Sequence, residues 1–193
     1  MEGRPPCRPQ IQMSDSPHPA RRHPAHHAPI ERFNEPVVVQ VNVCTQNRQP
    51  VLACDAIHRI CREVWQSADF WHVGTYVIMP DHIHLFCSPG RISMPSLRQW
   101  VEYWKGQIAK RFSGGTTSVS SEEMKSAKTA DTEVGPPDVF KLWQRDFWDT
   151  QMRSREHYDE KMAYVRLNPV RKGLANTRED WPYQGEVFPL AWR

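Results

Sequence analysis

Two histidines stand one residue apart in the apolar run YVIMPDHIHLFCSP, which covers residues 76–89. If this run is a β-strand, alternation of side chains places His82, His84 and Phe86 on one face of the sheet. Two imidazoles on one face either find hydrogen-bond partners within the protein or hold a metal ion. The pair alone leaves both alternatives open, because a pattern this short also arises by chance.

A second group of polar residues lies in the segment SREHYDEKMAYVRLNP, residues 154–169, which has helical spacing. Its apolar stripe consists of Tyr158, Met162 and Val165. Tyr164 lies well away from that stripe and one helical turn before Asn168, so both side chains can face a common site. Pro169 disfavours α-helical geometry at the residue before it, so we expect Asn168 to end the helix. A half-exposed tyrosine and a simple helix stop are the alternative explanations.

The elements that position these residues indicate an α+β protein. Strands are expected at 36–46, 71–80, 82–88 and 139–148, and helices at 51–66, from Ser93 to about Phe112, and at 154–168. The second and third strands form a predicted hairpin across Pro80 and Asp81. Ser93 is the expected N-cap of the second helix, with Pro95 in its first turn. The first six elements match the ferredoxin-like split βαβ pattern, an antiparallel sheet with two helices on one face and the other face free to bind.

Composition divides the chain of 193 residues into an expected tail and one domain. Residues 1–34 hold seven of the 17 prolines and four of the nine histidines, so we expect a disordered His/Pro-rich tail. Residues 35–193 are long enough for a single domain with a hydrophobic core. Within that domain, the stretch 113–138 is rich in Gly, Ser and Thr and carries five acidic residues against two lysines. We expect it to be a flexible acidic insertion.

Cysteine usage and hydropathy indicate a cytoplasmic protein. The five cysteines form no C-x-x-C pair, which argues against a disulfide framework or a cysteine zinc site and favours a reducing compartment. No apolar run approaches the roughly 18 residues of a transmembrane helix, and the N-terminus lacks the apolar core of a secretory signal. The formal net charge of +3 is compatible with nucleic acid but does not require it.

Five stretches follow one another along the chain, VIMPDHIHLFCSP, YWKGQIAKRF, LWQRDFWDTQMRS, YVRLNPVRKGL and EDWPYQG. In this combination the chain resembles the single-tyrosine "histidine-hydrophobic-histidine" transposases, and most closely the REP-associated tyrosine transposases. The resemblance spans about residues 36–185. It implies a ferredoxin-like catalytic domain, in a bacterial protein that works at the nucleoid. Such a domain cleaves and rejoins single-stranded or hairpin DNA through a 5′-phosphotyrosine intermediate.

The resemblance also assigns roles by motif position. His82 and His84 would bind a divalent metal and Tyr164 would be the nucleophile, while Asn168 stands where related enzymes place a third polar ligand. The family points to Mg²⁺ or Mn²⁺ with a DNA phosphate completing the coordination, whereas imidazoles by themselves favour Zn²⁺ or Mn²⁺. A phenol with a pKa of about 10 is a weak nucleophile at neutral pH, so a metal that polarises the phosphate makes chemical sense. Asp81 ranks below Asn168 as a ligand, because it is expected on the opposite face.

Basic and aromatic residues near these motifs are candidates for contacting DNA. The candidates for neutralising phosphates are Lys105, Arg145, Lys161, Arg166, Arg171 and Lys172. A solvated helix surface explains most of them equally well, and Arg171 and Lys172 are favoured. Trp148 and Trp143 are candidates for stacking on unpaired bases, although core packing explains Trp143 at least as well.

Two other functions stay open at this point. A catalytically inactive protein of the same fold would bind hairpin DNA or RNA without cutting it, and Tyr164 separates that function from the enzyme. A small zinc hydrolase would need a third strong ligand that the sequence does not offer. The sequence also leaves open whether the protein is a monomer or a homodimer, and whether a partner's Tyr164 completes each site.

Overall fold

The computed structural model describes residues 26, 28–30, 36–91, 95–116 and 142–190. Most of the tail expected at 1–34, most of the insertion expected at 113–138, and Ser93 lie outside the described residues. None of the helices within those described ranges is long and apolar enough to cross a bilayer.

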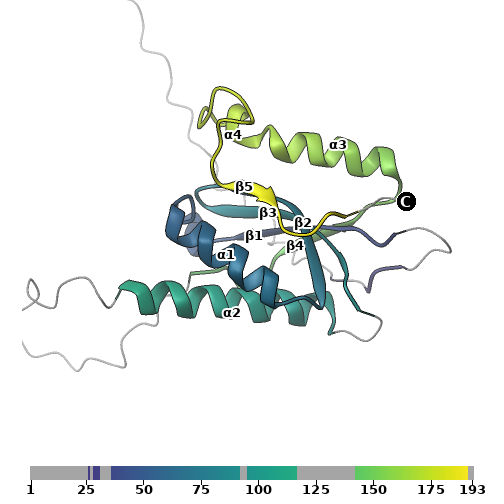
Figure 1. The fold of residues 1–193 in the computed structure, drawn as a ribbon, viewed down its shortest axis with the longest axis horizontal. Coiled ribbons are helices and arrows are strands. Elements are labelled where there is room, and N and C mark those ends of the chain that lie inside the picture. The colour runs from purple at the N-terminus through teal and green to yellow at the C-terminus, as the bar shows by residue number, and fades with distance from the viewer. Residues whose placement is uncertain (1–25, 27, 31–35, 92–94, 117–141, 191–193) are drawn as a thin grey trace, which may run out of the picture.

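A five-stranded antiparallel sheet forms the centre of the protein (Figure 1). Its strands are β1 (Val39–Cys44), β2 (Trp71–Ile78), β3 (His82–Pro89), β4 (Trp148–Gln151) and β5 (Gln184–Glu186). The helices are η1 (Gln46–Arg48), α1 (Asp55–Ser67), α2 (Leu97–Thr116), α3 (Arg155–Arg166) and α4 (Asn168–Arg171). The strand order is β4-β1-β3-β2-β5, and every neighbouring pair is antiparallel. The first four strands with α1 and α2 confirm the predicted ferredoxin-like fold class, and β5 extends the sheet beyond β2.

Alternation along β3 sends its side chains into two different cores. Ile83, Leu85 and Cys87 pack with residues of α1 and α2 on one face of the sheet. Phe86 packs on the other face, where its ring meets that of Tyr158 from α3 edge-on, with ring centroids 5.2 Å apart. Figure 1 shows α1 and α2 on one side of the sheet and α3 on the opposite side. We call the side that carries Phe86 and faces α3 the α3 face.

The predicted strand at 139–148 is wrong, because β4 begins only at its last residue, Trp148. The preceding residues Leu142, Trp143 and Phe147 are buried in the core beneath α1 and α2. Their apolar side chains fill that core, and Trp143 forms an isolated bridge with Thr45. The first part of this aromatic-rich run therefore packs in the core, and only its last residue belongs to a paired strand.

Two helix boundaries also differ from expectation. Pro95 precedes α2 instead of lying in its first turn, because Ser96 is the residue that caps this helix. Ser96 Oγ accepts a hydrogen bond from the backbone N–H of Gln99, whose side-chain oxygen accepts one from the Ser96 N–H. Asn168 does not end the last helix but begins α4, in which Pro169 occupies the first turn, where its missing N–H costs no hydrogen bond. The other predicted elements are confirmed with ends shifted by up to four residues.

Candidate active site

His82 and His84 point from β3 into one place on the α3 face, where their Nε2 atoms lie 3.0 Å apart. His82 Nδ1 lies 2.6 Å from a carboxylate oxygen of Asp81, and His84 Nδ1 contacts the amide oxygen of Asn42. Because both oxygens are acceptors, each imidazole carries its proton on Nδ1 and presents the lone pair of Nε2. Two lone pairs that face each other at this distance repel unless a proton or a cation lies between them.

Burial keeps both imidazoles neutral. Desolvation, with a smaller contribution from the charge of neighbouring His82, lowers the pKa of His84 to about 3. Desolvation also lowers the pKa of His82, although the Asp81 carboxylate acts in the opposite direction. At neutral pH each ring is therefore neutral and its Nε2 carries no proton, as metal ligation requires.

Two residues contact the Nδ1 atoms of the histidines, which face away from the paired Nε2 atoms. Asn42 is the residue of β1 directly opposite His84 in the strand pairing, which brings its amide to His84 Nδ1. Asp81 lies in the turn before β3 and is itself paired with Arg48, whose Nε is 3.0 Å from the carboxylate. Metal-ligating histidines usually have such a partner on the second ring nitrogen. The expectation that Asp81 lies on the opposite face is wrong: its position in the turn lets the carboxylate reach the outer nitrogen of His82.

Asn168 reaches the same place from the start of α4. Its amide nitrogen lies 3.0 Å from His84 Nε2. The nitrogen and oxygen of a side-chain amide exchange places when the group flips, so the oxygen of Asn168 can instead face a cation held by the histidines. The structure therefore brings together His82, His84 and Asn168 from distant parts of the sequence.

These residues fit a divalent cation. No group of three or more His, Cys, Asp or Glu side chains suited to a metal occurs in the described part of the chain, so the two histidines need ligands of another kind. The Asn168 amide oxygen, water and phosphate oxygens can supply them. An octahedral ion with bonds of about 2.1 Å places neighbouring ligand atoms about 3.0 Å apart, which matches the distance between the two Nε2 atoms.

Tyr164 lies on α3 four residues before Asn168, and 50% of its surface is exposed. Backbone hydrogen bonds from the N–H groups of Leu167 and Arg171 continue the helical path across the junction of α3 and α4. Since residues four apart share one side of a helix, Tyr164 lies on the side from which Asn168 reaches His84. The guanidinium carbon of Arg171 is 4.5 Å from the centre of the Tyr164 ring.

The residues predicted to contact DNA differ in exposure. Arg145, Lys161, Arg171 and Lys172 are exposed, and Arg166 is half-buried. Trp148 is 52% exposed, whereas Trp143 is buried. Lys105 is buried too, and its ammonium donates to the carbonyl oxygens of Gln144 and Arg145 at 2.8 and 3.0 Å. This corrects the prediction that Lys105 neutralises a phosphate, because its charge is used inside the protein.

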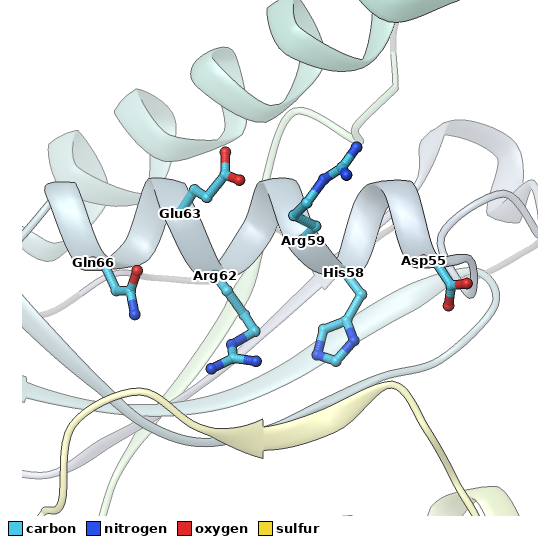
Figure 2. A pocket seen from close by; sticks show the side chains of 6 residues that line it. All are labelled: Asp55, His58, Arg59, Arg62, Glu63 and Gln66. Carbon is cyan, nitrogen blue, oxygen red and sulfur yellow. The ribbon is translucent and has the colours of Figure 1, made fainter.

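A hollow of about 280 Å³ lies beside α1, away from this site, and none of the predicted site residues lines it (Figure 2). Figure 2 shows His58 and Arg62 pointing from α1 toward the yellow strand β5. His58 Nε2 is 2.8 Å from the Tyr76 hydroxyl. Burial lowers the pKa of His58 and raises that of Tyr76 to about 12, so this pair is an uncharged structural contact.

No family model matches the chain. The chain is 23% identical over 160 residues to a Haemophilus influenzae protein named among the REP-associated tyrosine transposases. The aligned region covers 78% of this chain and 84% of that relative. It is 28% identical over 58 residues to the REP-associated tyrosine transposase of Escherichia coli, covering 26% of this chain and 35% of that protein. A solved structure of a REP-associated tyrosine transposase bound to a REP hairpin superimposes with a TM-score of 0.51 and 16% identity, over 86% of this chain and 96% of that one. In sequence and in fold, the chain thus resembles the REP-associated tyrosine transposases, as its motifs predicted.

Proposed function

We propose that the protein is a DNA transposase that cleaves and rejoins single-stranded or hairpin DNA through a 5′-phosphotyrosine intermediate. One observation carries this proposal: the paired Nε2 atoms of His82 and His84 meet the amide of Asn168, which begins α4 four residues after Tyr164 of α3. The names of the relatives support transposition, and the hairpin bound by the solved relative supports a hairpin substrate.

We assign His82, His84 and Asn168 as ligands of a divalent metal, Mg²⁺ or Mn²⁺. When bound, such an ion polarises the scissile phosphate and stabilises the departing 3′ oxygen. Asp81 and Asn42 fix the tautomers of the two imidazoles, so that both Nε2 lone pairs face the same point.

Tyr164 performs the covalent step. Its phenolic oxygen attacks the phosphorus of the scissile phosphodiester, a new P–O bond forms to the tyrosine, and the P–O3′ bond breaks. The phenolic proton passes to solvent and the 3′ oxygen takes up a proton, which leaves a free 3′-OH and a 5′-phosphotyrosine. Attack by a second 3′-OH on the phosphotyrosine reverses these changes and joins two strands without ATP, because the ester retains the bond energy.

Covalent capture of DNA tests the proposal. The full chain is incubated with a pool of labelled hairpin oligonucleotides that carry single-stranded flanks, in the presence of Mg²⁺ or Mn²⁺. We expect an adduct that survives denaturing electrophoresis, requires the metal, and maps to Tyr164 by mass spectrometry. Tyr164→Phe should bind the hairpins but form no adduct, whereas Tyr103→Phe, at an exposed tyrosine of α2, should retain both.

The outcomes separate the candidate functions. Equal adduct yields in Tyr164→Phe and in the unchanged chain would refute the assignment of Tyr164 as the nucleophile. Hairpin binding without an adduct in any variant would favour the inactive DNA- or RNA-binding protein. Turnover of a substrate with tightly bound Zn²⁺ and without a covalent intermediate would favour a hydrolase.

A further inference from the structure

Trp148 differs from the other tryptophans that the structure describes. Six of these are at most 8% exposed, whereas Trp148 leaves 52% of its surface exposed. The residue before it, Phe147, is buried in the core beneath α1 and α2. Alternation along the strand therefore turns Trp148 to the α3 face.

Strand pairing places Trp148 in one row with the candidate active site. Asn42 of β1 is directly opposite Trp148 of β4 on one side and directly opposite His84 of β3 on the other. Residues directly opposite each other in an antiparallel sheet point to the same face. With about 4.8 Å between neighbouring strands, Trp148 emerges about 10 Å from His84. A single strand of DNA spans that distance in a few nucleotides.

The surroundings of Trp148 leave its indole accessible. β4 is the outermost strand on its side of the sheet. Thr150, the next residue of β4 on this face, is exposed as well, and the Asn42 side chain beside Trp148 is held by His84. Asp149 points to the opposite face, where it contacts His26. The accessible surface at this point is therefore a flat, uncharged aromatic ring, which matches the face of a nucleobase.

We propose that Trp148 is a stacking platform for an unpaired base of the strand whose phosphate binds at His82 and His84. This inference rests on the proposed function and adds a binding site to it. Stacking on an indole accepts every base, because each has a π-face, so this platform distinguishes single strands from duplex but does not read sequence. It would hold the strand at a fixed distance from the proposed nucleophile, Tyr164.

Binding in a chain that cannot form an adduct tests the platform. In the Tyr164→Phe background, Kd is measured by fluorescence anisotropy at one salt concentration for a labelled oligo-dT strand and for a matched duplex. We expect Trp148→Ala to raise the Kd for oligo-dT about 5- to 150-fold, the loss typical of one stacked base. Trp148→Phe should recover most of the affinity, and the Kd for duplex should not change.

Tyr103→Ala is the matched control, since Tyr103 is 54% exposed but lies on α2, on the other side of the sheet. It should leave the Kd for oligo-dT unchanged. Photocrosslinking of a 5-iodo-deoxyuridine strand should label Trp148. An unchanged Kd in Trp148→Ala, no measurable oligo-dT binding by the parent chain, or a crosslink elsewhere would overturn the platform. None of these results depends on adduct formation, so they are distinct from failure of the proposed function.

Discussion

The guanidinium of Arg171 lies over the ring of Tyr164, with its central carbon 4.5 Å from the ring centre. Arg171 belongs to α4, which also carries Asn168 to His84. Two short helices joined at Leu167 therefore hold these groups: α3 carries the proposed nucleophile, and α4 carries a proposed metal ligand and a positive charge. A cation over an exposed aromatic ring contributes about 0.5–1 kcal/mol, enough to favour one orientation of the Tyr164 ring.

Arg171 should accordingly position Tyr164 for attack. We expect Arg171→Ala to slow single-turnover adduct formation at saturating DNA by about tenfold, since both ring orientation and a charge beside the attacked phosphate are lost. Arg171→Lys should recover part of the rate, because it restores the charge without the planar group. Arg155→Ala, at an exposed residue of α3 that pairs with Asp159, is the control. A rise in Kd with no change in the saturated rate would reduce Arg171 to a phosphate contact.

Asn42 should tune the affinity for metal although it is not a ligand. Asn42→Ala removes the acceptor from His84 Nδ1, and loss of such a partner usually weakens metal binding 10- to 100-fold. Asn42→Asp should retain affinity, because a carboxylate accepts the same hydrogen bond. Titration of the protein with Mn²⁺, followed by electron paramagnetic resonance, measures the change. Asn176→Ala alters an exposed asparagine and should have no effect, and equal affinities in Asn42→Ala and the unchanged chain would contradict the role.

Local sequence patterns predicted the elements that carry the candidate site. The alternation of HIHLF placed His82 and His84 on one face of β3, and helical spacing placed Tyr164 on α3, although Asn168 begins α4 instead of ending that helix. Both patterns depend on residues close in sequence. Helix α4 was missed because proline disfavours helical geometry at the residue before it but does not forbid it.

The structural features that sequence analysis missed depend on which strands pair with each other. Asn42 lies among the valines of β1, and nothing local shows that His84 will be its neighbour from a strand 42 residues away. The strand β5 was missed because the sequence QGE has no β-propensity. Its Gly185 instead permits a close approach to Tyr76, whose hydroxyl would be 2.8 Å from an added Cβ atom.

Acid should destabilise the metal-free protein through His84. Its pKa is about 3 when folded and about 6.5 when unfolded, so between these values the unfolded state binds more protons. The contribution of neutral His84 to the unfolding free energy is complete above about pH 6.5 and is lost as the pH falls toward 3. Over that range the unfolding free energy falls by up to about 1.4 kcal/mol per pH unit. His82, whose pKa is also lowered, adds to the loss in the same direction.

Urea unfolding in the presence of a chelator, at a series of pH values below neutral, measures this slope. His84→Gln removes the titrating group and should give a flatter dependence of the unfolding free energy on pH. Parallel curves for His84→Gln and the unchanged chain would contradict the assignment.

Lys105 should act on stability and leave DNA affinity unchanged. Its ammonium satisfies the carbonyl oxygens of Gln144 and Arg145, and its own carbonyl accepts from the indole N–H of Trp143. Lys105→Met keeps the length of the side chain but leaves the two carbonyl groups without this donor, which should lower the unfolding free energy by about 1–3 kcal/mol.

Lys161→Met, at an exposed residue of α3, is the comparison. It should leave stability unchanged and, if Lys161 contacts a phosphate, reduce the salt dependence of DNA binding by about one counterion. Lys105→Met should leave that salt dependence as it is, because a charge enclosed by two carbonyl groups cannot also neutralise a phosphate. A weaker salt dependence with an unchanged unfolding free energy in Lys105→Met would show that Lys105 reaches DNA after all.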